Sequence, residues 1–138
     1  MQGSCLCGDV AFEITGKIPD MYQCHCSLCR KVTGSASNTA FVISARRFRW
    51  LAGSEQLSSF TRGVGYRTDF CSRCGSPVPN PSNDGTEIWV PAGLLDEPTD
   101  ARVTRHVFVG SKAAWDEIGG SAPQFDEGDE RDEAVSDQ

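Results

Sequence analysis

The sequence predicts a single, mainly β domain, and three observations support this fold class. Short segments of alternating apolar and polar residues recur along the chain, as in half-buried strands. Turns rich in glycine and proline separate these segments. The length of 138 residues suits one domain with a modest core and is too short for two ordinary ones. We also expect one short helix near the C-terminal end.

The first strand is expected within residues 3–16. There Val10, Phe12 and Ile14 alternate with more polar neighbours, which is the period-two pattern of a strand with one buried face. After a turn, residues 21–23 can lead back as a second strand. This strand would deliver the chain into a cluster of cysteines.

One helical turn is expected directly after that strand, in residues 27–33. Ser27 is a suitable N-cap and Gly34 a suitable stop. Residues 35–43 begin small and polar and become apolar, which predicts another strand whose early part lies against a crowded site. Small residues there would leave room for a ligand.

The middle of the chain predicts two further extended segments. Residues 55–61 alternate weakly, with Leu57 and Phe60 as the buried members, and residues 65–70 form the strand that follows. Residues 76–85 contain three prolines, which do not suit a central strand, and read as a loop.

The last elements are a strand, an extended piece and a helix. The strand covers residues 87–95, and Pro91 places it at a sheet edge or a bulge. Residues 106–110 are extended. The helix is expected in residues 111–118, with Ser111 as its N-cap and apolar residues at helical spacing.

Charge divides the chain into residues 1–125, the domain, and residues 126–138, an acidic tail. The tail carries the whole formal net charge of −6 and one sizeable apolar residue, so we expect it to be disordered. The remaining body is close to neutral. A general nucleic-acid-binding protein would normally carry a basic face, so we do not expect that function.

The sequence indicates a cytoplasmic protein without a membrane anchor. No charged and then apolar leader opens the chain, and no apolar run approaches the roughly 20 residues that span a bilayer. In a reducing cytosol, clustered cysteines are more often metal ligands or redox groups than disulfides. An odd number of cysteines also argues against a purely disulfide-bonded chain.

The seven cysteines divide into four and three. Two tight pairs, each followed by a glycine that we expect to take the positive-φ position of its turn, could together complete a closed zinc site of four thiolates: Cys5, Cys7, Cys71 and Cys74. The other three lie within six residues: Cys24, Cys26 and Cys29. A structural zinc takes four protein ligands, whereas a catalytic zinc keeps three and an open position. We therefore expect two zinc ions, and the second as a reactive centre.

Three alternatives to this reactive centre stay open at this point. His25 or a distant His106 could complete a second structural site, although His25 should point away from its cysteine neighbours in an extended segment. An iron-sulfur cluster would use the same thiols but normally takes four. Disulfides are the third alternative.

Two cations, Arg30 and Lys31, follow the third cysteine directly. They could offset the negative charge of a three-thiolate site or meet the carboxylates of a substrate. The alternative is that both are ordinary solvated surface charges.

Three cysteine motifs in register resemble the glutathione-dependent formaldehyde-activating enzyme family. They are Gly3-Ser4-Cys5-Leu6-Cys7-Gly8, Cys24-His25-Cys26-Ser27-Leu28-Cys29-Arg30-Lys31 and Phe70-Cys71-Ser72-Arg73-Cys74-Gly75. Ser111-Lys112-Ala113-Ala114-Trp115 and Pro123-Gln124-Phe125 resemble the C-terminal signature of this family. The resemblance runs from about Gly3 to Phe125.

This resemblance implies a mainly β, Mss4-like fold with several small antiparallel sheets around a structural zinc. It assigns Cys5, Cys7, Cys71 and Cys74 to the structural ion, and the other three cysteines to the catalytic one. The implied activity is that of a carbon-sulfur lyase, S-hydroxymethylglutathione synthase, with glutathione and formaldehyde as substrates. Residues 119–122 depart from the more acidic and apolar segment usual in the family, which puts their contacts to a peptide-like ligand in doubt.

A zinc-stabilised binding module without catalytic activity is the alternative function, because fold alone does not set function. It would act by capturing a partner and would not respond to glutathione. The sequence does not identify the thiol, the aldehyde or the oligomeric state.

Overall fold

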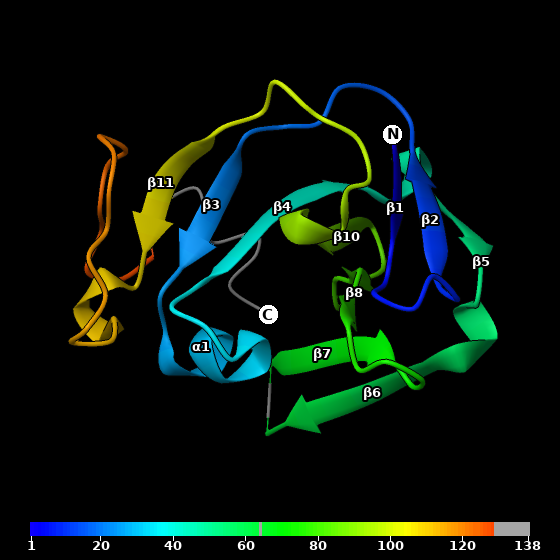
Figure 1. Cartoon of the computed structure of the whole chain (residues 1–138), viewed down its shortest axis with the longest axis horizontal. Coiled ribbons are helices and arrows are strands. Elements are labelled where there is room, and N and C mark those ends of the chain that lie inside the picture. Colours follow the sequence, from blue (N-terminus) through cyan, green and yellow to red (C-terminus); the bar gives the residue numbers. More distant parts are fainter. Residues whose placement is uncertain (64, 129–138) are drawn as a thin grey trace.

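A computed structural model describes residues 1–63 and 65–128 of the chain. The described residues form three small sheets and one short α-helix, as the sequence predicted for the fold class (Figure 1). None of the helices in these two ranges is long and apolar enough to cross a membrane.

The largest sheet has five strands in the order β11-β3-β4-β10-β9. Their bounds are β3, Met21–Cys24; β4, Asn38–Ser44; β9, Asn80–Pro81; β10, Glu87–Pro91; and β11, Val103–Val107. Neighbours pair antiparallel except β11, which runs parallel to β3 and places Val107 opposite Cys24. Strand β10 lies between β4 and β9, but β9 pairs only with Ile88 and Trp89 of β10. Pro91, which has no backbone N–H to donate, therefore has no neighbour on the β9 side.

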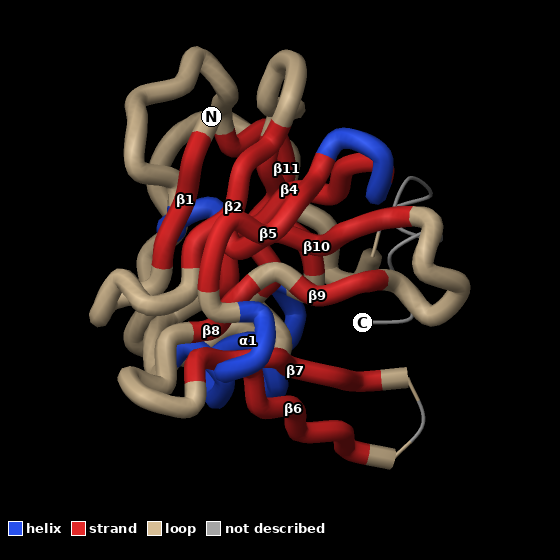
Figure 2. Tube along the Cα trace, turned by 90° about the vertical axis from the view of Figure 1, so that its right-hand side faces the viewer, coloured by secondary structure: helices blue, strands red, loops and turns tan. Residues whose placement is uncertain are grey.

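Two three-stranded antiparallel sheets flank the first. One has the order β1-β2-β5, with bounds Gln2–Ser4, Ala11–Ile14 and Phe48–Ala52. The other has the order β6-β7-β8, with bounds Leu57–Arg62, Tyr66–Cys71 and Pro77–Val78. Figure 2 shows the β6–β7 hairpin extending from the body of the domain. The side chain of Phe60 on this hairpin is 57% exposed, so the prediction that it is buried was wrong.

The α-helix α1 covers Ser27–Thr33, where the sequence predicted a helical turn. It ends at Gly34 in the left-handed conformation, as expected. The N-cap is Cys26 and not Ser27, because the Cys26 sulfur accepts the backbone N–H of Cys29 at 3.3 Å. Short 3-10 helices cover four further segments: Ala45–Arg47, Ser54–Gln56, Ala92–Leu94 and Val109–Ser111.

The core lies on both faces of the five-stranded sheet. On one face Phe12 and Ile14 of β2 pack against Phe41, Ile43 and Val90, which confirms the buried face predicted for the first strand. The second cluster is smaller and joins Tyr22, Trp89 and Val107 to the cysteines next to α1. The cysteines next to α1 therefore lie at the end of an apolar face.

The helix predicted in residues 111–118 is absent. Only the 3-10 turn Val109–Ser111 and a turn closed by the Asp116 N–H and the Ala113 carbonyl lie there. An eight-residue helix is marginal without a face to bury, and Trp115, which the helix would have used for packing, is 72% exposed. The contact between the Asp116 carboxylate and the His25 ring holds this segment in another conformation.

The C-terminal segment runs beside β11. The backbone of His106 bonds to Pro123 and Phe125 at 2.9 Å, and Phe125 packs against the cluster that contains Cys26 and Cys29. Backbone carbonyls of the first two tail residues accept bonds from the 108–110 turn. The predicted disorder of the tail stays a prediction, since residues 129–138 lie outside the described residues.

Candidate metal centres

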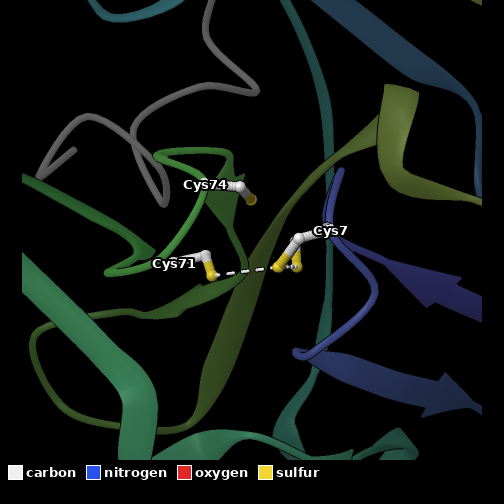
Figure 3. A group of neighbouring side chains, drawn as sticks. Cys7, Cys71 and Cys74 are labelled. Atoms are coloured by element: carbon white, nitrogen blue, oxygen red, sulfur yellow. Dashed lines mark hydrogen bonds between the residues drawn. The ribbon is translucent and has the colours of Figure 1, made fainter.

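The four cysteines predicted to bind a structural ion converge at one point, although their two pairs lie more than sixty residues apart. Cys5 and Cys7 lie in the turn between β1 and β2, Cys71 is the last residue of β7, and Cys74 lies in the following turn. All four sulfurs lie within 4.8 Å of one another. Figure 3 shows Cys7, Cys71 and Cys74 directing their sulfurs toward a common centre.

The spacing of these sulfurs fits a tetrahedral zinc site. A Zn–S bond of about 2.3 Å places the corners of a tetrahedron about 3.8 Å apart. The Cys5 and Cys7 sulfurs are 3.6 Å apart, and those of Cys7 and Cys71 are 3.8 Å apart. Unbonded sulfurs gather this closely where an ion is to lie between them, so these residues fit a four-thiolate site.

Glycines shape both cysteine turns as the sequence predicted. Gly8 and Gly75 have φ angles of 84° and 77°, a region that side chains disfavour. Their N–H groups donate to the carbonyls of Cys5 and Cys71, at 3.1 and 2.8 Å. Each glycine thereby folds its turn so that both sulfurs face the same point.

Backbone N–H groups also point at the sulfurs. The Val10 N–H donates to the Cys5 sulfur at 3.4 Å. The Ser76 N–H donates to Cys74 and, with the Cys7 N–H, lowers the pKa of that thiol to about 6. Such donors stabilise thiolates, which are the form that binds metal. The side chain of Cys71 is fully buried, so the site is closed from the solvent on that side.

The other three cysteines form a second group within one short stretch. Cys24 ends β3, Cys26 caps α1, and Cys29 lies in the first turn of that helix. Their three sulfurs lie within 4.8 Å of one another. Hydrogen bonds from Cys24 and Cys29 hold the pKa of Cys26 far below its usual range, and the contact with Cys26 raises the pKa of Cys24 to about 11.

Within the described residues no fourth Cys, His, Asp or Glu side chain joins this group, and all seven cysteines are free thiols. His25 points away from its cysteine neighbours, as predicted. Its Nε2 lies 3.0 Å from Nδ1 of His106, and its Nδ1 faces Asp116. Neither histidine is therefore placed as the fourth ligand, and the donor set consists of three thiols.

Tyr66 reaches this group from the first position of β7, and the sequence analysis missed it. Its side chain is half-buried, and its hydroxyl lies near enough to Cys29 and Cys26 to be affected by their charges. Burial, followed by the negative charges of Cys29 and Cys26, raises the pKa of Tyr66, so the hydroxyl stays protonated. No local sequence signal marks this contact, because it joins two sheets. The same strand ends at Cys71 and so connects the two cysteine groups.

The two predicted cations lie on α1. Lys31 is exposed, and Arg30 is half-buried. The Nε of Arg30 is fully buried, and the described residues offer it no hydrogen-bond partner. The structure thus leaves one donor of Arg30 unused, on the residue that follows Cys29 in α1.

Comparison with known proteins identifies relatives of this chain. The profile of the family described as "Glutathione-dependent formaldehyde-activating enzyme" matches residues 1–111. A Halomonas elongata protein, provisionally named as an enzyme of this kind, is 28% identical over 126 residues, which are 86% of this chain and 80% of that protein.

A solved structure shares the fold. The crystal structure of a Rhodobacter sphaeroides protein superposes with a TM-score of 0.59 and 23% sequence identity. The match covers 75% of this chain and 100% of that one. The mainly β architecture is therefore also found in an experimentally determined structure.

Proposed function

This chain belongs to the glutathione-dependent formaldehyde-activating enzyme family, and we propose that it is a zinc-dependent carbon-sulfur lyase. In the synthetic direction it would join glutathione, or a similar thiol, to formaldehyde or a related small aldehyde. The observation that carries the proposal is the group of three convergent thiols with no fourth side-chain ligand among the described residues.

The two cysteine groups would have separate tasks. Cys5, Cys7, Cys71 and Cys74 would hold a structural zinc that folds with the chain. Cys24, Cys26 and Cys29 would hold a second zinc. When bound there, this ion would supply an open coordination position at which a thiol loses its proton more easily.

The chain's own residues would prepare the reaction around this position. The Cys29 backbone N–H stabilises the Cys26 thiolate, and the protonated hydroxyl of Tyr66 beside Cys29 can donate to an oxygen that approaches the centre. Arg30 and Lys31 would meet carboxylates of the thiol substrate, as glutathione carries. The buried Nε of Arg30 supports this assignment, because a substrate oxygen would satisfy it.

The bond changes are those of an addition. The sulfur of the thiol forms a bond to the carbonyl carbon, the C=O π bond opens, and its oxygen takes the proton that the thiol releases. The product is an S-hydroxymethyl thioether. The reverse reaction breaks the same C–S bond. We place this activity in the cytoplasm, because a reducing compartment keeps seven thiols free to bind metal.

The test is the rate of exchange between glutathione and its formaldehyde adduct, measured by two-dimensional exchange NMR with and without protein. This readout separates catalysis from the uncatalysed addition, which proceeds in the same tube. We expect the zinc-loaded protein to accelerate exchange and the Cys29→Ser variant to lose the acceleration. Exchange at the uncatalysed rate with fully zinc-loaded protein would reject the enzyme and favour a zinc-stabilised binding module.

A further inference from the structure

A buried chain of polar side chains lies behind the three-cysteine group. It consists of Asp116, His25 and His106, which come from three different segments. His25 is 2% exposed and His106 is 5% exposed. The two imidazoles meet at 3.0 Å between Nε2 of His25 and Nδ1 of His106, and Nδ1 of His25 lies 3.4 Å from Oδ2 of Asp116.

The donor and acceptor roles in this chain follow from Asp116. A carboxylate only accepts hydrogen bonds, so the proton on His25 belongs on Nδ1, which faces Asp116. Nε2 of His25 is then the acceptor, and His106 donates from its Nδ1. The contact of 3.4 Å is longer than an ordinary N–H···O bond. Among the described residues, however, both buried atoms have no other hydrogen-bond partner, so each depends on the other.

The arrangement differs from a metal site. The two ring nitrogens of His25 face different residues on opposite sides of the ring, whereas metal ligands converge on one point. The chain therefore fixes the position of the His25 ring. Because His25 lies between Cys24 and Cys26, this ring determines how that backbone segment is rotated.

Backbone bonds hold the same place from the other side. The His25 N–H donates to the Val107 carbonyl at 3.0 Å, and the parallel pairing of β3 with β11 sets Cys24 opposite Val107. These bonds set the register of the Cys24–Cys26 segment along β11. Successive side chains of an extended segment point in opposite directions. The direction in which the His25 ring is held is therefore linked to the direction of the two flanking cysteines.

Asp116 is itself held in place. Its N–H donates to the Ala113 carbonyl at 3.1 Å, and its own carbonyl accepts the Lys112 ammonium at 2.9 Å. The side chain of Ala113 is buried and anchors this turn. The carboxylate is thus presented to His25 by a turn that has contacts on both sides.

We propose that Asp116 and His25 are positioning residues that set the orientation of the Cys24–Cys26 segment, and thereby the metal affinity of the three-cysteine centre. The C-terminal turn would then belong to this centre although it contributes no cysteine. Asp116 lies beyond residues 1–111, which the family profile matches, so this support is not part of what the family match describes. The consequence for catalysis rests on the proposed function, but the effect on metal binding does not.

The test replaces zinc with cobalt(II), whose absorption reports thiolate coordination, and follows cobalt release to a chelator. The variants are Asp116→Ala and, as the conservative change, Asp116→Asn. Glu117→Ala is the matched control, because it removes a neighbouring carboxylate that is exposed. Partners of metal-binding groups typically contribute 10- to 100-fold in metal affinity. We expect release from the three-cysteine centre to be about 10-fold faster in Asp116→Ala, with a shifted cobalt spectrum.

The four-cysteine site is the internal reference, and its cobalt should be unaffected in every variant. Asp116→Asn, which keeps an acceptor oxygen and the shape of the side chain, should restore most of the wild-type behaviour. Glu117→Ala should match wild type throughout. If Asp116→Ala does not fold, Asp116→Asn carries the test, with a smaller but measurable acceleration expected.

Three results would overturn the proposal: unchanged release in both Asp116 variants, equal loss of both cobalt ions, or a wild-type protein that binds only one. Failure of the proposed function looks different. A wild-type protein that binds two cobalt ions but does not accelerate thiol–aldehyde exchange would reject the lyase, and the cobalt release would still measure the role of Asp116.

Discussion

The two cysteine groups present the same side chain, and they differ in where their members come from along the chain. In the first group Cys7 and Cys71 are 64 residues apart, so an ion between them would close a long loop of the chain. In the second group, three residues on one strand end and one helix turn supply all the sulfurs. Distance along the sequence thus separates a group that could close a long loop from a local group.

The strongest contrast should appear in folding. Cys71→Ser removes a buried ligand of the four-cysteine site, and structural zinc sites contribute about 10–16 kcal/mol of metal-binding free energy to folded zinc peptides. We expect the variant to be unfolded or insoluble, as judged by circular dichroism and solubility. Cys24→Ser is the matched control from the other group and should stay folded. Equal damage by both would contradict the distinction.

The reverse contrast should appear in activity. Cys29→Ser should keep the fold, with a melting temperature within a few degrees of wild type, because its group closes no long loop. It should lose at least about 100-fold in thiol–aldehyde exchange, because loss of a hydrogen-bond partner of a metal ligand alone can reach that size. Thermal melting and exchange NMR on the same sample provide both values. A folded variant with full activity would remove the second group from the proposed mechanism.

A smaller effect should appear on acidification, through the histidines behind the second group. Burial lowers the pKa of His106, so the neutral form is favoured in the folded state. Its contribution is complete above about pH 6.5, the usual value for histidine. It is lost as the pH falls from there toward the lowered pKa of the folded state.

His106→Gln keeps a donor for His25 but does not titrate. Between pH 7.5 and 5.5 the wild type should therefore lose more stability than the variant, by on the order of 1 kcal/mol. Urea unfolding of the zinc-loaded proteins measures this difference. Metal release at low pH occurs in the wild type and the variant alike, so it cancels in the comparison. Parallel losses in the two proteins would show that His106 takes up no proton in this range.

The smallest effect concerns the strand that connects the two groups. Tyr66→Phe removes the hydroxyl beside Cys29, and one hydrogen bond is worth about 1 kcal/mol. We expect about a 5-fold loss in exchange rate with little change in melting temperature. Thr68→Val alters the same face of β7 without reaching the cysteines and serves as control. The same loss in both variants would indicate a general disturbance of β7.

Much of this comparison could be predicted from the sequence, because cysteine spacing and period-two alternation are local signals. The division of the cysteines into a group of four (Cys5, Cys7, Cys71 and Cys74) and a group of three follows from the sequence alone. Likewise, Val10, Phe12 and Ile14 are buried as their alternation predicted. The glycines after each cysteine pair also adopt the conformation that their position indicated.

The missed features depend on contacts between distant segments. The predicted helix over residues 111–118 is absent, since Asp116 turns toward His25 and no apolar face is buried there. Tyr66 had no motif to mark it as a neighbour of Cys29. Phe60 followed the alternation of its strand, but the hairpin extends from the body and leaves it exposed. Local patterns do not report such juxtapositions.

The most direct test of the account is the number of zinc ions per chain, measured by elemental analysis before and after brief mild chelation, with and without glutathione. We predict two zinc ions, of which chelation removes one, and glutathione should protect that ion by occupying its open position. Two equally inert ions, or a single ion unaffected by glutathione, would contradict the claim that the second cysteine group is an open, thiol-binding centre.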